Sequence, residues 1–179
     1  MKKIIIVCLN LILIISLGAC SFKKTSSENK KTPAETNTPK ADTSQEKVNI
    51  KVSMPDGWTA VAGSVLPVHY MKDTSSTMVK EEKFSSKALD DIVLEVKGIF
   101  NKTFENTKYI GEVEKITVDG FDGRKFLMTC NVSKLNMKYE YVYLSVNDHI
   151  YVITFGDFAK TFDSHTQDYQ QILENISFN

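Results

Sequence analysis

The chain has 179 residues, of which 42% are hydrophobic, 25% charged and 10% aromatic, close to the usage of ordinary globular proteins. This composition excludes a collagen-like chain, a long coiled coil and a wholly disordered protein, and the presence of a single long apolar run excludes a multi-span membrane protein. The 22 basic and 22 acidic residues give a net charge of zero, so no basic excess exists to neutralise nucleic-acid phosphates, and nucleic acid is not an expected partner.

Residues 1–19 have the pattern of an export signal. Lys2 and Lys3 precede an apolar run of 16 residues from Ile4 to Ala19. As a helix this run would cover roughly 24 Å, which is short of a bilayer core of about 30 Å. The pattern therefore indicates a signal peptide rather than a permanent membrane span.

The segment Leu17-Gly18-Ala19-Cys20 resembles the lipobox of bacterial lipoproteins. The resemblance implies cleavage before Cys20 and a diacylglyceryl anchor on its thiol, with fatty acyl chains such as palmitate. Each buried methylene contributes about 0.8 kcal/mol, so two chains hold a protein firmly on a bilayer. We expect a protein lipid-anchored to the extracytoplasmic face of a cell membrane; the alternative is a retained short anchor with an incidental cysteine.

Residues 20–46 comprise the lipidated cysteine and a polar linker. The linker is rich in Lys, Ser, Thr, Asn and Glu, and Phe22 is its only large apolar residue. Such a composition cannot bury enough apolar surface to offset chain entropy, so we expect a disordered tether. Its coil would span roughly 28 Å, which would hold the following domain away from the bilayer.

Residues 47–179 have the length of one typical domain. Alternating and helical hydrophobic spacing predict its elements in chain order. These are a half-buried strand over 48–54, a turn at 55–58, strands over 66–72 and 77–84, a helix capped by Ser85 or Ser86 with its apolar stripe over 89–100, strands over 109–118, 124–132, 137–146 and 150–155, and a helix near 161–176.

The connections between these elements predict the fold class. Two Asp-Gly pairs within 119–123 predict a hairpin, and short turns between successive strands favour antiparallel pairing. The almost wholly apolar segment 150–155 predicts a central strand covered on both faces. We therefore expect an α+β fold in which an antiparallel β-sheet is flanked by helices as an αβα sandwich.

The order of elements resembles the PsbP-like domain. That family includes the extrinsic P subunit of photosystem II, a Ran-binding nuclear-import relative and many bacterial lipoproteins. The resemblance implies a non-catalytic binding or assembly role and supplies no catalytic residues to transfer. It rests on the opening strand into Pro55-Asp56-Gly57-Trp58, the mid-chain helix, the segment from Val113 to Arg124, the strand from Tyr151 to Phe155, and the last helix closing at Ser177-Phe178.

The sequence predicts no catalytic residues, no metal site and no cofactor, and hence no enzyme. It contains no Gly-x-Ser-x-Gly elbow, no P-loop and no paired zinc ligands. The three histidines, His69, His149 and His165, do not lie within four residues of one another, so they form no helical metal pair. Glu112 and Glu114 would share one strand face and attract Ca²⁺ weakly, or would simply be solvated.

Four aromatic side chains are the candidate binding residues. Trp58 is the only tryptophan and follows a turn, which fits either an exposed interaction residue or a core anchor. Tyr139, Tyr141 and Tyr143 share one face of the strand over 137–146. They would form an interface if exposed, or would be covered by a helix.

Cys130 would be the only thiol left after Cys8 is removed with the signal peptide and Cys20 is acylated, so no intramolecular disulfide is expected. Cys130 falls in an alternating run with Phe126, Met128 and Val132. This pattern favours a small core residue over a reactive thiol.

The expected function is that of a membrane-anchored extracytoplasmic lipoprotein whose non-catalytic domain binds or assembles with an unidentified protein or envelope component. The alternative is a small-ligand or cation-binding lipoprotein for transport or sensing, and an envelope hydrolase is disfavoured by the absent motifs. A large pocket with convergent polar groups favours the alternative, and a flat exposed aromatic patch favours the first function. A buried base within reach of a serine or cysteine would favour the hydrolase.

Overall fold

The computed structural model describes residues 48–179, so the expected signal peptide, Cys20 and tether lie outside the described residues. Its helices are α2 (Leu89–Thr103), the short 3₁₀ helix η2 (Phe162–His165) and α3 (Thr166–Asn175). Its strands are β1 (Ile50–Val52), β2 (Thr59–Ala60), β3 (Val68–Lys72), β4 (Ser75–Glu82), β5 (Glu105–Val118), β6 (Phe121–Val132), β7 (Leu135–Val146), β8 (His149–Phe158) and β9 (Ile176–Phe178).

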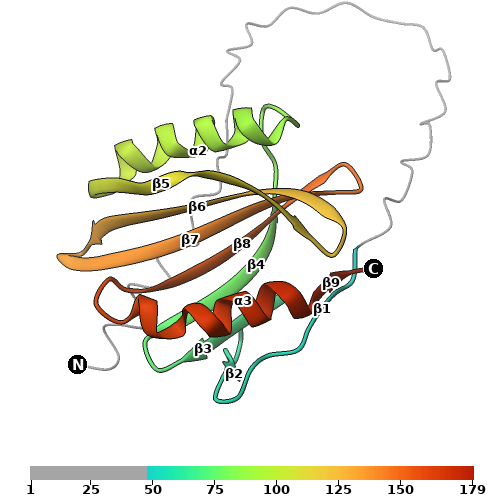
Figure 1. The fold of residues 1–179 in the computed structure, drawn as a ribbon, viewed down its shortest axis with the longest axis horizontal. Helices are drawn as coiled ribbons and strands as arrows, with labels where there is room; N and C mark the ends of the chain where they lie inside the picture. The colour runs from blue at the N-terminus through green and yellow to red at the C-terminus, as the bar shows by residue number, and fades with distance from the viewer. Residues whose placement is uncertain (1–47) are drawn as a thin grey trace, which may run out of the picture. The chain divides into compact units, whose positions relative to one another are not determined.

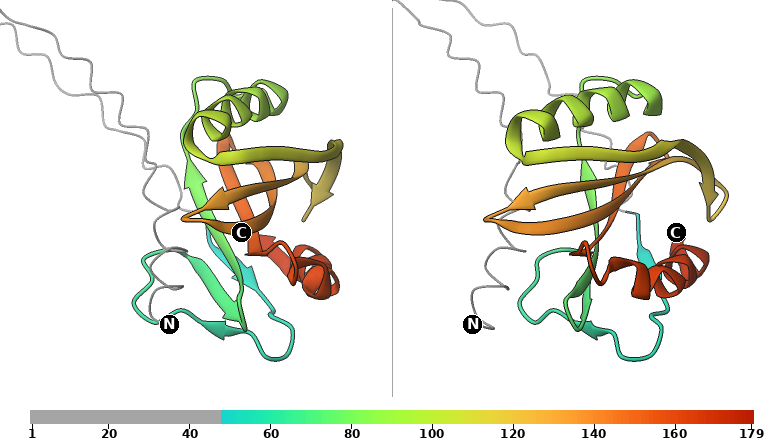
Figure 2. Two further views of the ribbon diagram at one scale, coloured as in Figure 1. Left: turned by 90° about the vertical axis from the view of Figure 1, so that its left-hand side faces the viewer. Right: turned by 60° about the vertical axis from the view of Figure 1, so that its left-hand side comes forward.

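The main sheet is antiparallel, as the short turns predicted. Its strands run in the order β2-β3-β4-β8-β7-β6-β5 (Figure 1), and every neighbouring pair is antiparallel. Helix α2 lies on one face of the sheet, over β5, β6 and β7, and α3 lies on the opposite face (Figures 1 and 2). The predicted αβα arrangement is therefore confirmed. Across residues 48–179, neither α-helix has the length and apolarity needed to cross a bilayer.

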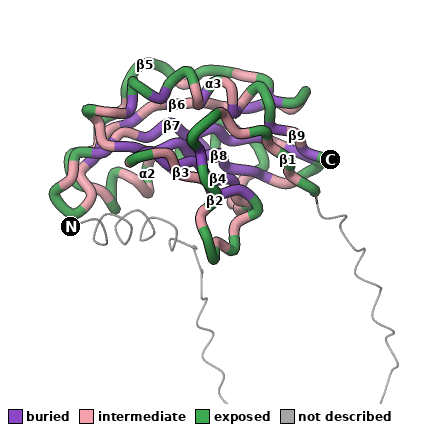
Figure 3. Tube along the Cα trace, turned by 90° about the horizontal axis from the view of Figure 1, so that it is seen from below, coloured by how far each residue is buried: buried purple, intermediate pink, exposed green. Residues whose placement is uncertain are grey.

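Strand β8 is central, as its apolar sequence predicted. It lies between β4 and β7, and all its residues except the two at its ends are buried (Figure 3). Tyr151, Ile153 and Phe155 point towards α3 and pack with Tyr169 and Ile172 in the main core. The side chains between them in the sequence face the other way, so β8 contributes to both layers of the sandwich.

The predicted Asp-Gly hairpin forms at the first of the two pairs. Asp119 and Gly120 are the two loop residues between β5 and β6, with φ of 49° and 81°, the conformation of a type I′ turn. The second pair is not a turn, because Gly123 lies inside β6. A Cβ atom at this position would lie 2.7 Å from Cδ2 of Leu144, which is too close for a side chain. Glycine therefore fits at this strand position where a larger residue would require Leu144 to move.

The start of α2 differs from the prediction. Neither Ser85 nor Ser86 caps the helix; Ala88 occupies the N-cap position without a side-chain hydrogen bond. Ser86 Oγ instead accepts a hydrogen bond from the amide of Ala88 and donates one to Asp91. Ser86 therefore stabilises the turn that precedes α2 and does not bond to the unpaired amides of the first helical turn.

The last helix also differs from the prediction. The expected helix near 161–176 is divided into η2 and α3, and Ile176–Phe178 leaves it as strand β9. This strand pairs with β1 rather than with the main sheet, with Ile50 opposite Phe178. The amide of Phe178 donates a hydrogen bond to Oδ2 of Asp119, which links the end of the chain to the β5–β6 turn.

Candidate ligand pocket

A pocket of about 510 Å³ lies between α3 and the part of the sheet formed by β5, β6 and β7. Ligand pockets in proteins usually measure about 300–1,000 Å³. Its apolar lining comes from Ile116 and Val118 on β5 and from Tyr169 and Leu173, one turn apart on α3. Its charged groups include Lys125 on β6 and Glu140 on β7. The lining therefore combines hydrocarbon walls with a few charged groups, as small-molecule sites do.

The curvature of β5 opens this space. The register of β5 against β6 shifts between Ile110 and Glu114, and Gly111 within this irregular stretch has a φ of +69°. A β-bulge increases the local twist of a strand. The β5–β6 hairpin curves towards the α3 side of the sheet (Figure 2), which leaves the pocket between the hairpin and the helix.

Glu140 is the unusual group in the lining. It is 8% exposed and lies on the α3 face of β7, opposite Phe155 of β8 and Leu127 of β6. Within residues 48–179 its carboxylate has neither a hydrogen bond nor an ion pair. Burial raises the pKa of Glu140 above its usual value, Glu114 adds to the effect, and Lys125 and Lys138 oppose it.

Other charged groups near the pocket have partners. Lys125 Nζ lies 3.1 Å from Oε2 of Glu114, and Oδ2 of Asp119 accepts the amide hydrogen of Phe178 at 2.7 Å. Oε1 of Glu174 accepts a hydrogen bond from Gln170 at 3.1 Å. Glu140 thus differs from its neighbours in being a buried carboxylate that faces a pocket without a bonded partner. Glu140 is not among the binding residues that the sequence predicted.

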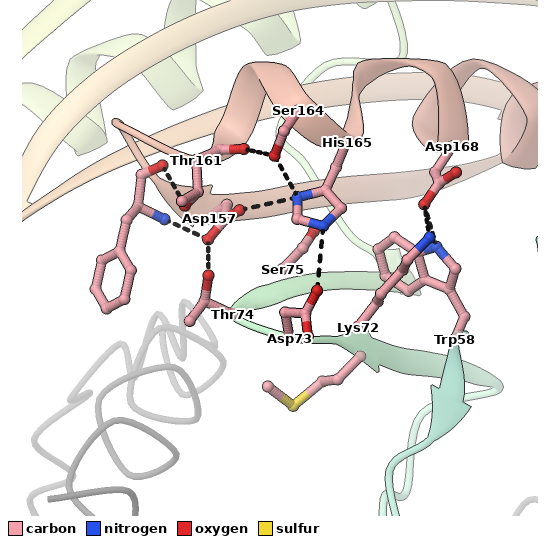
Figure 4. Close-up of polar contacts among 12 residues, drawn as sticks. Trp58, Lys72, Asp73, Thr74, Ser75, Asp157, Thr161, Ser164, His165 and Asp168 are labelled. Carbon is pink, nitrogen blue, oxygen red and sulfur yellow. Dashed lines mark hydrogen bonds and ion pairs between the residues drawn. The ribbon is translucent and has the colours of Figure 1, made fainter. Parts of the chain in front are cut away.

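A second polar cluster joins the β3–β4 turn to η2 (Figure 4). Asp157 at the end of β8 is fully buried, and its Oδ1 accepts hydrogen bonds from Thr74 Oγ1 at 2.6 Å and from the amide of Phe158 at 2.7 Å. Its Oδ2 lies 3.2 Å from Nδ1 of His165, just before α3. The cluster fixes the start of α3 against the turn between β3 and β4.

This cluster contains a serine, a histidine and an aspartate but lacks the geometry of a catalytic triad. Ser164 Oγ lies 3.5 Å from Nδ1 of His165, the same ring nitrogen that contacts Asp157. In a triad, the serine and the aspartate bond to opposite nitrogens of the histidine. The Ser164 hydroxyl instead donates to the carbonyl of Thr161 at 2.6 Å. The arrangement therefore gives no support to the hydrolase.

Trp58 lies inside the domain. It is 7% exposed, and its Nε1 donates a hydrogen bond to Oδ2 of Asp168 on α3 at 2.9 Å, as Figure 4 shows. Lys72 Nζ lies 2.8 Å from the same oxygen, and the ring of Tyr169 meets the indole edge-on. These contacts favour the interpretation of Trp58 as a core anchor, and its role in binding stays a prediction.

The three tyrosines of β7 lie on the opposite face of the sheet from the pocket. Tyr141 and Tyr143 are buried, and the ring of Phe100 on α2 lies 4.9 Å from that of Tyr141. The ring of Tyr139 is 5.9 Å from that of Tyr141. Helix α2 thus covers part of the row, as the alternative interpretation expected, and a role in binding stays a prediction for all three residues.

The remaining candidate cation ligands are dispersed. Glu112 and Glu114 are both exposed, and Glu114 pairs with Lys125. Nδ1 of His149 lies 2.7 Å from Oε1 of Glu81. Among residues 48–179, no three or more His, Cys, Asp or Glu side chains are grouped so that they would hold a metal ion.

Cys130 is a buried core residue, as the alternation predicted. Burial raises the pKa of its thiol to about 11. At pH 8 only about one thiol in a thousand would be ionised, so we expect the folded chain with Cys20 acylated to react with a disulfide reagent at least 100-fold more slowly than the chain in denaturant. Spectrophotometric titration with such a reagent measures this, and comparable rates in the two states would contradict it.

No protein-family profile and no curated protein matches the sequence. Similar solved structures include LpqN, described as involved in cell envelope biogenesis of Mycobacterium tuberculosis, with a TM-score of 0.58 and 12% identity over 74% of this chain and 84% of LpqN. A protein of unknown function from Pseudomonas aeruginosa has a TM-score of 0.50 and 13% identity over 80% of this chain and 90% of its own.

Cyanobacterial PsbP from Synechocystis has a TM-score of 0.50 and 10% identity, over 73% of this chain and 87% of its own. Identities of this size show a common fold and nothing further. The order of strands and the two helix layers described above agree with the fold that the sequence resemblance implied. Residues 48–179 therefore have a PsbP-like fold.

Proposed function

We propose that the chain is a lipoprotein, held on the extracytoplasmic face of a membrane through Cys20, whose PsbP-like domain binds a small molecule without catalysing a reaction. The observation that carries the proposal is the pocket of about 510 Å³ with the buried carboxylate of Glu140 in its lining. A large pocket with convergent polar groups is the feature that separates small-ligand binding from an interface with a protein.

The positions of the aromatic residues add support. An exposed row of aromatic side chains would favour a protein partner, because rigid rings supply contact area at low entropy cost. Trp58, Tyr141 and Tyr143 are instead buried, and aromatic rings on the helices contact Trp58 and Tyr141. An unidentified protein or envelope component stays the second candidate. The description of LpqN as a protein of cell envelope biogenesis supports a location in the envelope for either function.

Ligand binding is tested by the melting temperature of the full processed chain in detergent, measured against small amines, alcohols and carboxylic acids. A ligand at 100 times its Kd stabilises the folded state by about 2.7 kcal/mol. Gln170 lines the pocket and Gln171 does not. We expect the stabilisation to disappear in Gln170→Trp and to persist in Gln171→Trp. No stabilisation by any compound, or equal stabilisation in both variants, would contradict binding at this site.

Membrane anchoring is tested by Cys20→Ala. The variant lacks the thiol that would carry the diacylglyceryl group, so we expect uncleaved or released protein and no acyl modification. Membrane fractionation with mass spectrometry of the N-terminal peptide measures both properties. Cys8→Ala is the matched control, because that residue lies within the expected signal peptide and its loss should leave processing unchanged. An acylated Cys20→Ala protein in the membrane fraction would overturn the assignment.

A further inference from the structure

The carboxylate of Glu140 lacks the partner that a buried charge ordinarily has. Carboxylates accept hydrogen bonds, and buried ones in proteins are paired or hydrogen-bonded because desolvation of an isolated charge is costly. Glu140 is more than nine-tenths buried, lines the pocket and has no hydrogen bond or ion pair within residues 48–179. Such a group points to a ligand that supplies the missing positive charge.

The nearby lysines do not supply it. Lys125 and Lys138 are the basic residues whose charges act on Glu140. Lys125 Nζ is 3.1 Å from Glu114 Oε2, and Lys138 Nζ is 2.6 Å from Asp163 Oδ1. Both ammonium groups are therefore paired with other carboxylates, and neither forms an ion pair with Glu140.

The shape of the site favours an organic cation over a metal ion. Calcium takes six to eight oxygen ligands and zinc takes about four, and the described residues 48–179 contain no such group of ligands. The lining instead includes the apolar side chains of Ile116, Val118 and Leu173. These surfaces suit the carbon skeleton of an amine.

The balance of charge opposes an anionic ligand. The lining carries the acidic side chains of Asp119, Glu140 and Glu174 against the single basic side chain of Lys125. A carboxylate or phosphate ligand would meet like charges, whereas an ammonium group would meet a net negative surface.

We propose that the pocket binds a small organic amine whose protonated nitrogen pairs with the carboxylate of Glu140 while its hydrocarbon part contacts Ile116, Val118 and Leu173. This inference rests on the proposed small-molecule binding function and names the chemical class of the ligand. The raised pKa of Glu140 in the free domain agrees with it, because a bound ammonium group would favour the ionised carboxylate and so provide the charge that the site lacks.

The test compares three molecules of matched size. Isothermal titration at pH 7 measures the binding of butylamine, 1-butanol and butyrate to the full processed chain in a neutral detergent, with detergent alone as the blank. We expect butylamine to bind more tightly than the other two. Glu140→Gln, which keeps the shape of the side chain and removes its charge, should weaken butylamine binding by about 10- to 100-fold, the effect of losing a charged hydrogen bond.

Glu112→Gln is the matched control, because Glu112 is an exposed glutamate on β5 outside the lining, and it should bind butylamine as the unmodified chain does. Melting curves establish that each variant is folded. Equal binding of butylamine and 1-butanol, or unchanged butylamine affinity in Glu140→Gln, would overturn the ammonium inference. If 1-butanol or butyrate binds and Gln170→Trp abolishes it, the binding function stands and only the ligand class is wrong. If none of the three binds, the ammonium inference fails, and the melting-temperature test with the wider set of compounds decides whether the binding function stands.

Discussion

Replacing Asp157 with leucine is expected to lower the free energy of unfolding by about 3 kcal/mol or more. Leucine is similar in size, so the effect comes from lost hydrogen bonds rather than from a cavity. The Thr74 hydroxyl and the Phe158 amide would lose their acceptor inside the protein, and His165 would lose the carboxylate beside its Nδ1. Urea denaturation of the purified chain, followed by tryptophan fluorescence, measures the change.

Asp163→Leu is the matched control, because the Asp163 side chain is 77% exposed, so its ion pair with Lys138 is open to solvent on one side. Exposed pairs contribute about 0–1 kcal/mol, so this variant should unfold close to the unmodified chain. Similar losses in Asp157→Leu and Asp163→Leu would show that the buried hydrogen bonds of Asp157 contribute no more to the free energy of unfolding than an exposed ion pair does. A large loss at Asp157 alone would mean that the β3–β4 turn and η2 are joined mainly by this carboxylate, which positions the first turn of α3 beside the pocket.

The sheet was predictable from the sequence because its signal is local. Alternation over 137–146 and the continuous apolar run over 150–155 each specify how a strand is buried, whatever its neighbours are. The end of the chain was not predictable in this way. Ile176 continues the helical spacing of α3, and only pairing with β1, more than a hundred residues earlier, places it in a strand.

The pocket could not be predicted from local patterns either. It depends on the irregular register between Ile110 and Glu114, on the curvature of the β5–β6 hairpin and on the position of α3, which come from distant parts of the chain. The aromatic candidates were selected by residue type, and in the structure all four side chains are buried. The local pattern gave only a weak signal, because Glu140 lies on its strand face between Lys138 and the apolar residues Val142, Leu144 and Val146.

Replacing Glu140 with leucine is expected to raise the free energy of unfolding by about 1–3 kcal/mol at pH 7, because it removes a buried carboxylate without a partner. The gain should be smaller at pH 4. Burial raises the pKa of Glu140 in the folded state, against the opposing charges of Lys125 and Lys138, and Glu114 adds to the rise. Above the ordinary value of 4.5 the unfolded chain ionises first, so the folded state of the unmodified chain loses stability as pH rises through the window between the two values.

Urea denaturation at pH 4 and pH 7 measures this difference between Glu140→Leu and the unmodified chain. Glu112→Leu is the control, since an exposed glutamate should give no comparable gain at either pH. A gain that is equal at the two pH values would mean that folding does not raise the pKa of Glu140. A loss at pH 7 would mean that contacts in the free domain stabilise its carboxylate. A Glu140→Leu variant that is more stable than the unmodified chain but no longer binds butylamine would show that the carboxylate lowers stability and is needed for binding. Natural proteins retain destabilising residues of this kind where function requires them.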